Sequence, residues 1–191
     1  LFGDYVLTEE DILSQPIRSD SVAYGGWPMD EHVAGGFHAK GSIPSFVRSF
    51  PGLFSIPYGC YCSRNIENLM MAGRNISASK LAMGATRVMG TCAIGGEAAG
   101  TAAAMAAKAG LSPRAFGKQH IQTLRQELLK NDCYIIGAKN EDEKDLARIA
   151  RVSASSEQSG FEAVNVVNGI ARSTDAASNL WRSDGVSSSG E

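Results

Sequence analysis

The sequence has 191 residues, a net charge of −2 and a pI near 6.0. A chain of this length can form one domain and the beginning of another, and its charge argues against an electrostatic nucleic-acid-binding protein. Hydrophobic residues make up 43% of the chain, which suits a globular core. The 21 glycines exceed an average usage of roughly 7%, so we expect tight turns and close backbone approaches.

The first fifty residues are rich in Gly-Gly and Pro turn signals that break up any long periodicity. Within them, Thr8 followed by three acidic residues predicts the start of a helix. Residues 53–62 (LFSIPYGCYC) are predicted to form a short strand that runs into a turn. Residues 68–73 (NLMMAG) are a compact apolar run ended by Gly73, the pattern of a strand buried on both faces.

The second half of the chain begins with two predicted helices. The first runs from Thr91 to Ala109, with Thr91 as its N-cap and Gly110 as its stop. Ser112-Pro113 opens the second, in which apolar residues recur at helical spacing: Ile121, Leu124 and Leu128. A charged connector over 137–150 follows. Residues 151–191 are rich in Ser and Asn with short β-branched pieces, which favours a β-domain. This segment is too short for an independent β-sandwich, which takes about a hundred residues.

Three further features limit the classes of protein. The chain begins with Leu, with neither an initiator Met nor a signal-peptide pattern, so we expect an excised piece of a longer protein. The Ala-rich run at 98–107 is too short and too weakly apolar to span a membrane. Cys60-Tyr-Cys62 lacks zinc-knuckle spacing and no second pair follows, so no metal site is predicted. The four cysteines are expected to be ordinary thiols, with a disulfide left open for an exported protein.

The small residues of the first predicted helix leave two interpretations open. Its start offers unpaired N–H donors and the positive end of the helix dipole, an arrangement that can hold a cofactor. Nine alanines lie between Cys92 and Gly110, with Gly95, Gly96 and Gly100 among them, and such a helix lets neighbouring backbone approach closely. The other interpretation is a tightly packed buried helix that binds nothing.

Five segments of the sequence favour the first interpretation, a cofactor site. They are GGWPMDEH, IPYGCYCSRNIENL, AGRNISAS, GATRVMGTC and GGEAAGTAAAMA. In this order they resemble the C-terminal flavin-binding segment of the FAD-dependent oxidoreductase family, over roughly residues 20–136. The resemblance implies an α/β fold, the C-terminal portion of a Rossmann-like FAD-binding domain, over residues 1–136. It also implies a preceding portion with the GxGxxG unit for the ADP half of FAD. Nothing here matches that fingerprint, so we expect this piece alone to hold FAD poorly and to be inactive.

The same resemblance assigns cofactor contacts to the first part of the segment. Gly73 and Arg74 would lie beside the ribityl chain or pyrophosphate of FAD, with Ser77 and Ser79 as further polar contacts there. Each of these four residues belongs to the piece AGRNISAS, so the assignment depends on that piece alone.

The predicted helix supplies the remaining contacts implied by the resemblance. Thr91 and Cys92 would direct N–H groups at the N1/C2=O edge of the flavin. Reduced flavin carries negative charge at that edge, so such donors would raise its reduction potential. Gly96 would permit a close approach, and Glu97 stands where the family usually has Gln. Glu97 therefore adds a carboxylate near the cofactor and puts a side-chain amide contact in doubt.

Three residues are candidates for the chemistry. GATRVMGTCA resembles, more distantly, a segment of the fumarate reductase and aspartate oxidase relatives in which the Arg binds the substrate's carboxylate. That position is Arg87 here, and a structural Arg bonded to loop carbonyls is the alternative. Asp30 and His32 form a polar pair in a Gly/Pro-rich loop, where functional residues concentrate. His32 could move the proton that accompanies hydride transfer, although such pairs also occur on inert surfaces.

The tail resembles the opening of a discoidin-like (coagulation-factor type C) domain. The matching pieces are Val152, 154–156, 165–169 and 181–183, with Asn168 in place of the usual Asp. This resemblance implies an incomplete β-sandwich, a jelly roll that binds glycans or surfaces, and a flexible Ser-rich tail is the alternative for the last residues. A genuine discoidin-like module would favour a periplasmic or secreted protein, and the sequence does not otherwise fix the compartment or the oligomeric state.

Two functional hypotheses follow, from different classes. The first is a bacterial FAD-dependent oxidoreductase that transfers hydride from a small polar, carbohydrate-derived substrate to flavin N5, with the substrate class inferred from the tail alone. The second is a non-catalytic flavin-fold scaffold that presents a glycan-binding module, supported by Glu97 in place of Gln and by the missing fingerprint. A structural role for an isolated fragment is the weakest alternative. Flavin content and glycan binding of the full-length protein discriminate between the first two.

Overall fold

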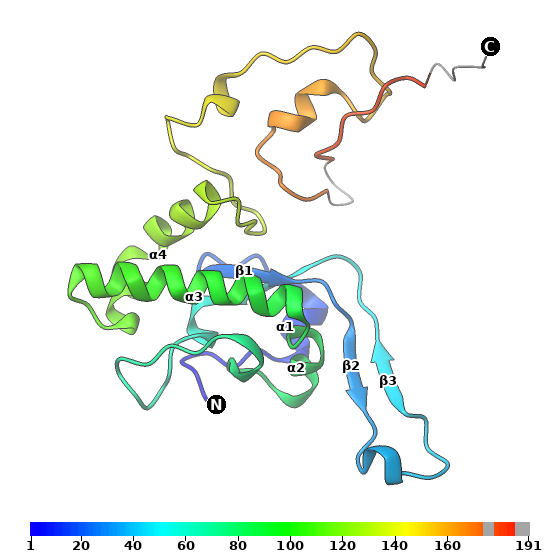
Figure 1. The fold of residues 1–191 in the computed structure, drawn as a ribbon, viewed down its shortest axis with the longest axis vertical. Helices are drawn as coiled ribbons and strands as arrows, with labels where there is room; N and C mark the ends of the chain where they lie inside the picture. Colours follow the sequence, from blue (N-terminus) through cyan, green and yellow to red (C-terminus); the bar gives the residue numbers. More distant parts are fainter. Residues whose placement is uncertain (174–177, 186–191) are drawn as a thin grey trace. The chain divides into compact units, whose positions relative to one another are not determined.

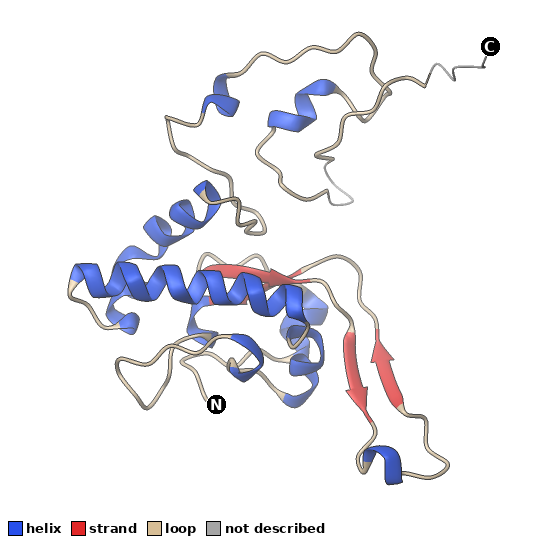
Figure 2. Cartoon of the chain, in the orientation of Figure 1, coloured by secondary structure: helices blue, strands red, loops and turns tan. Residues whose placement is uncertain are grey.

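The computed structural model describes residues 1–173 and 178–185 (Figure 1). The chain divides into two compact units, Leu1–Gly137 and Ala138–Glu191. The first unit is a mixed α/β fold with four helices and two small antiparallel sheets among its described elements (Figure 2). The described residues of the second unit contain short 3-10 helices and no strand.

Helix α1 (Glu9–Ser14) begins where the sequence predicted it. The Thr8 hydroxyl accepts a hydrogen bond from the Asp11 N–H, and the Asp11 carboxylate accepts one from the Thr8 N–H, which is a capping box. Burial raises the pKa of Asp11, but hydrogen bonds from Tyr5 and Thr8 and the charge of Arg18 outweigh it, so this pKa lies below its usual value. The carboxylate therefore stays ionised at neutral pH and keeps the cap in place.

The core sheet pairs β1 (Ser21–Gly25) with β4 (Phe54–Pro57) in antiparallel register. All four residues of β4 are buried, and the chain then turns into the 3-10 helix η2 (Tyr58–Cys60). The predicted strand and turn over 53–62 are thus confirmed. A side chain at Gly25 would overlap the ring of Phe54, so only glycine fits opposite this phenylalanine.

The second sheet is a hairpin of β2 (Met29–His32) and β3 (Ser45–Arg48), with the 3-10 helix η1 (Gly36–His38) between the strands. Figure 1 shows it projecting from the rest of the first unit. The turn signals of the first fifty residues did not predict these strands. Each strand has only four residues, and β3 is largely exposed, so neither shows the alternation that marks a half-buried strand.

The strand predicted over 68–73 is wrong. Met70 forms a single isolated bridge with Cys62, and the 3-10 helix η3 (Gly73–Asn75) follows. Met71 is buried, whereas Leu69 is exposed, so the run is covered on one side only. An apolar run of this length does not specify which partner, if any, will pair with its backbone.

Three helices complete the first unit: α2 (Lys80–Thr86), α3 (Met89–Ala109) and α4 (Pro113–Lys130). Helix α3 begins two residues earlier than predicted. Its N-cap is Val88, and Thr91, the predicted N-cap, lies inside its first turn. Gly110 ends it in the left-handed conformation with φ of +66°, as predicted. The side chain of Ser112 caps α4, as predicted, and α4 is kinked at His120, whose backbone leaves helical geometry.

Helix α3 packs against β1, α4 and η3. Its buried face consists mainly of alanine, at Ala98, Ala99, Ala102 and Ala106, so the neighbouring backbones lie close to its axis. Gly95 makes the closest approach, because a Cβ there would lie 2.6 Å from the Tyr61 hydroxyl. The close packing predicted for the small residues of this helix is therefore present where Gly95 meets the side chain of Tyr61.

The second unit contains η4 (Leu146–Ile149) and η5 (Ala163–Val167). Its backbone is held by a bridge between Gln158 and Phe161 and by hydrogen bonds that both residues make with Arg182. The jelly roll predicted for 151–191 stays a prediction, since the described residues form none of its strands. Residues 174–177 and 186–191, which belong to the predicted module, lie outside the described residues.

Candidate functional site

The structure brings together the three residues predicted to carry the chemistry. Arg87 lies just after α2, and its Nη2 donates hydrogen bonds of 3.3 Å to both the backbone oxygen and Oδ2 of Asp30. His32 Nε2 lies 3.8 Å from the same Oδ2. We call Asp30, His32 and Arg87 the Asp30 cluster. Residues more than fifty positions apart in the sequence thus form one group at the connection between α2 and α3.

Close packing of α2 on β2 positions this cluster. At Gly84 a Cβ would lie 2.6 Å from the backbone oxygen of Asp30 and 2.9 Å from its nitrogen, so glycine is required for the two elements to meet. An ion pair between Lys80 and Glu31 joins the same two elements on the surface. Helix α2 therefore holds Arg87 at a fixed place beside β2.

The cluster has both satisfied and unsatisfied polar atoms. Asp30 Oδ1 is buried and has no hydrogen-bond partner among the described residues. Arg87 bonds Asp30 through Nη2 alone, which leaves donors of its guanidinium for another acceptor. The His32 side chain is 61% exposed, compared with 22% for Asp30 and 28% for Arg87. A histidine that is open to solvent and beside a carboxylate can accept a proton and remain paired.

Sequence reasoning missed Thr86, which immediately precedes Arg87. Thr86 is 1% exposed, and its hydroxyl has no hydrogen-bond partner among the described residues. Its backbone oxygen lies 3.5 Å from the Cys92 sulfur, which donates to it. A threonine within an apolar stretch carries no signal in the sequence, and only the neighbouring Arg87 could have drawn attention to it.

The amino end of α3 follows directly and is open. Met89 is 89% exposed, and no described atom outside the neighbouring helix backbone lies within 4 Å of a Cβ placed on Gly90. Val88 contributes no side-chain cap, whereas side chains cap α1, α2 and α4. The first N–H groups of a helix have no partner within the helix and carry its positive dipole. Thr91 is buried within this first turn, and the cofactor contacts predicted for Thr91 and Cys92 stay predictions.

The residues of AGRNISAS lie in different surroundings. Gly73 has φ of +85° and opens η3, which packs against α3, and Arg74 is exposed. Ser79 is the N-cap of α2, accepting from the Ala82 N–H and donating to Glu9. Ser77 is fully buried, and its hydroxyl has no hydrogen-bond partner within the described part of the chain, so it offers no surface to a ligand. The cofactor contacts predicted for these residues stay predictions.

Gly96 and Glu97 lie farther along α3. Apart from the neighbouring backbone of α3 itself, no described atom lies within 4 Å of a Cβ placed on Gly96, so the close contact is made by its neighbour Gly95 instead. Glu97 is eight residues from the start of the helix, a distance of about 12 Å along its axis. Burial and a hydrogen bond with Glu97 raise the pKa of Cys133 to about 12. Glu97 thus contacts the segment after α4 and not the amino end of α3.

The cysteines provide a first testable prediction. All four are free, and burial raises the pKa of Cys60 to about 12 and that of Cys62 to about 11. Because the thiolate is the nucleophile, iodoacetamide at pH 8 is expected to leave these two unmodified in the folded protein and to modify them in urea. Peptide mass spectrometry measures this, with half-buried Cys92 as the internal comparison. Modification of Cys60 at the rate seen in urea would contradict the burial.

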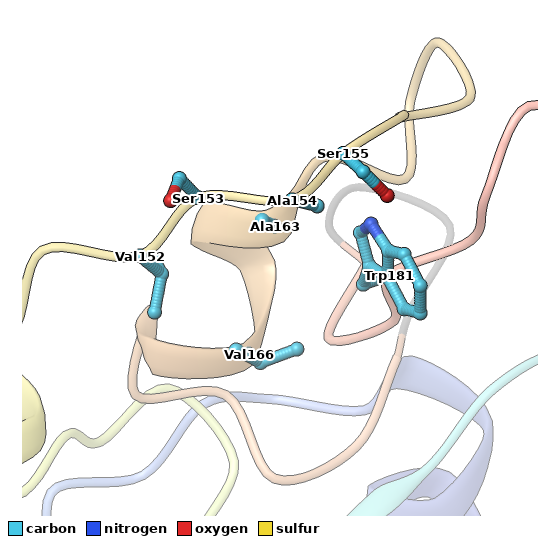
Figure 3. A pocket seen from close by; sticks show the side chains of 7 residues that line it. All are labelled: Val152, Ser153, Ala154, Ser155, Ala163, Val166 and Trp181. Carbon is cyan, nitrogen blue, oxygen red and sulfur yellow. The ribbon is translucent and has the colours of Figure 1, made fainter.

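Two hollows are lined by other residues of the chain. The second unit has a cavity of about 350 Å³ (Figure 3), with Trp181 over one side and a lining of small and apolar residues: Val152, Ser153, Ala154, Ser155, Ala163 and Val166. A groove of about 620 Å³ lies between α3 and α4, near the carboxyl end of α3, and includes Lys108, His120 and Glu127. Neither hollow contains a residue of the cluster.

Comparison with known proteins gives one match. The family model described as FAD dependent oxidoreductase matches residues 1–128, which include the Asp30 cluster and the whole of α3. No curated protein and no solved structure matches the chain. Within the described residues, no group of side chains could hold a metal ion, and no helix has the length and apolarity needed to cross a bilayer. Since the match covers about two thirds of the sequence, the chain belongs to the FAD dependent oxidoreductase family, whose cofactor is FAD.

Proposed function

We propose that the Asp30 cluster binds and deprotonates a small polar substrate as it loses hydride to flavin N5. The observation that carries this proposal is the convergence of Arg87 and His32 on Asp30, whose Oδ2 lies 3.3 Å from Arg87 Nη2 and 3.8 Å from His32 Nε2. The family membership makes the chain part of an oxidoreductase. Arg87 of this cluster precedes the first residue of α3, Met89, by two positions.

Each residue of the cluster has a separate role in the proposal. His32 accepts the proton that the substrate hydroxyl loses as its C–H bond is broken, and Asp30 stabilises the resulting imidazolium. The guanidinium donors that Arg87 does not use for Asp30 bind a carboxylate or hydroxyl of the substrate and orient it. In the absence of substrate, the Arg87–Asp30 bonds keep both side chains in place.

The amino end of α3, from Met89 to Cys92, and the turn at Gly73 and Arg74 are the parts of the chain that would hold FAD. The N–H groups at the start of α3, which have no partner within the helix, and its positive end favour negative charge. Bound FAD supplies the two-electron acceptor. The exposure of Met89 and the open space at Gly90 leave room for a group to approach this end.

The substrate class and domain organisation are also proposals. The resemblance of the tail to a discoidin-like module suggests a carbohydrate-derived substrate. We propose an oxidoreductase region over 1–136, a linker over 137–150 and the discoidin-like segment over 151–191, and the division into compact units after Gly137 supports this arrangement.

The proposal is tested with the full-length protein, purified in native form and loaded with FAD. A panel of sugars and sugar acids is screened for bleaching of the visible flavin absorbance. His32→Gln is expected to lower the rate of bleaching by about 10²–10⁴-fold, the usual contribution of a general base, and Arg87→Met to raise KM. His38→Gln, a histidine outside the cluster, is the matched control.

Two outcomes would overturn the proposal. The first is a full-length protein that carries no flavin and takes up none. The second is an enzyme in which His32→Gln and His38→Gln bleach flavin at the same rate. Glycan binding that persists without FAD, with no flavin reduction by any substrate, would instead favour the non-catalytic scaffold.

A further inference from the structure

The second unit contains the one asparagine of the sequence that a glycine follows, in the pair Asn168-Gly169. Asn168 ends η5 with φ of −77° and ψ of 0°, and Gly169 has φ of +77°, in the left-handed region that glycine adopts without strain. Gly169 is exposed, and no Cβ stands beside its backbone nitrogen. The nitrogen next to the Asn168 side chain is therefore open to base and water.

Two hydrogen bonds hold the Asn168 side chain in the folded unit. Its Oδ1 accepts a bond of 2.9 Å from the Ile170 N–H, the local turn that an asparagine makes with the backbone two residues on. Its Nδ2 donates a bond of 2.8 Å to the backbone oxygen of Ser178. The second bond joins η5 to a segment ten residues later in the chain.

The segment that follows Ser178 is held to the second unit by longer side-chain bonds. Asn165 Nδ2 donates over 3.1 Å to the oxygen of Leu180. The indole N–H of Trp181 donates over 3.2 Å to the oxygen of Ser156. Because the Asn168 bond is shorter than either, we expect it to contribute at least as much to holding this segment.

We propose that Asn168 is a site of spontaneous deamidation, and that its conversion releases residues 178–182 from η5. The Gly169 nitrogen gives its proton to hydroxide and attacks Cγ of Asn168. The new C–N bond closes a five-membered ring, the Cγ–Nδ2 bond breaks, and Nδ2 leaves as ammonia with a proton from water. A second water opens the ring to aspartate or isoaspartate. The net change takes up water and releases ammonia, and no electrons are transferred.

The folded second unit slows this reaction. The ring is nearly planar, so the Gly169 nitrogen must eclipse Cβ of Asn168 about the Cα–C bond, and with ψ of 0° it does not. The backbone therefore has to rotate, and both side-chain hydrogen bonds have to break, before the ring can close. Loss of two hydrogen bonds restricts such an opening by at least about tenfold.

The product no longer fits its surroundings. A carboxylate has no proton to donate, so an oxygen faces the Ser178 oxygen where the amide donated before. Two acceptors that face each other without a proton repel, and the bond to Ser178 is lost. The modification concerns the second unit alone and does not depend on the proposed oxidation chemistry.

The first experiment incubates the full chain in mildly alkaline buffer, with and without urea, and follows each asparagine by peptide mass spectrometry. Asn168 is expected to deamidate at least about tenfold faster in urea than in the folded chain. In both states it should react faster than Asn165, which valine follows. Gly169→Ala, compared in urea where both chains are unfolded, should slow the reaction because its methyl group hinders the attack.

Two results of this experiment would overturn the proposal. One is deamidation of Asn168 in the folded chain that is no faster than that of Asn165. The other is an equal rate for Asn168 with and without urea, since the folded contacts would then not protect it.

The second experiment compares Asn168→Asp with Asn179→Asp in the full chain. Both variants add the same charge, but Asn179 Oδ1 accepts from the Ser173 hydroxyl, and aspartate keeps that acceptor. Trypsin cleavage after exposed Arg182 is expected to be about fivefold faster in Asn168→Asp, the factor for one lost hydrogen bond. It should be unchanged in Asn179→Asp. Equal cleavage of the two variants would show that the Asn168 bond does not hold the segment.

Discussion

Replacing Phe54 with alanine is expected to lower the free energy of unfolding by about 3–5 kcal/mol, the range for removing a buried phenylalanine. Phe54 is 0% exposed in β4, and its ring fills the space left by Gly25 on the paired strand. It also meets the ring of Phe50 edge-on, with centroids 5.6 Å apart. Truncation leaves a cavity that glycine on the opposite strand cannot fill. Urea denaturation followed by circular dichroism measures the loss.

The chain supplies a matched control for this substitution. Phe37 is 99% exposed, so Phe37→Ala is expected to change the free energy of unfolding by less than about 0.5 kcal/mol. Equal losses for the two variants would mean that Phe54 is not in a packed core, and the arrangement of β1 and β4 would then be wrong.

Replacing Gly84 with alanine is expected to cost about 1–3 kcal/mol, the usual penalty for overpacking. The added methyl would lie 2.6 Å from the oxygen and 3.1 Å from the carbonyl carbon of Asp30, and backbone cannot move aside as a flexible side chain does. The relief of this overlap moves α2 away from β2 and lengthens the bonds of Arg87 to Asp30. In the FAD-loaded protein, oxidation should therefore fall together with stability.

Gly100→Ala is the control for Gly84→Ala. Gly100 lies within α3, and apart from the adjacent helix backbone no described atom is within 4 Å of the position that a Cβ would take there. Alanine has the higher helix propensity, so this substitution is expected to stabilise the protein by about 0.5–1 kcal/mol. A comparable loss of stability in both variants would show that glycine is required for helix geometry in general and not for the contact with Asp30.

Local signals in the sequence predicted the structure well where the cause is local. Thr8 with its acidic neighbours, Ser112-Pro113 and Gly110 mark helix ends because the side chain or the left-handed backbone acts within a turn of itself. The strand predicted at 68–73 was wrong because a strand needs a partner from elsewhere in the chain. The hairpin strands were missed for the related reason that β3 has no covered face to impose a pattern.

The candidate site was predictable in its residues but not in its geometry. Asp30, His32 and Arg87 were selected from two separate stretches, and their contact depends on the packing of Gly84 against β2, which no spacing reveals. Thr86 was missed because its burial is a tertiary property. The cofactor contacts assigned to Ser77 and Glu97 find less support, since Ser77 is enclosed in the core and Glu97 contacts Cys133.

The break in α4 at His120 divides one helix into two pieces with different anchors. The first piece is held at Pro113, whose oxygen accepts a hydrogen bond of 2.9 Å from the Tyr58 hydroxyl, and the second at Arg125, which bonds the oxygen of Ser19. A helix of two turns does not persist in water by itself. Amide exchange should therefore be protected separately in the two pieces, and removal of the Tyr58 hydroxyl should accelerate it before His120 while leaving the later amides slow.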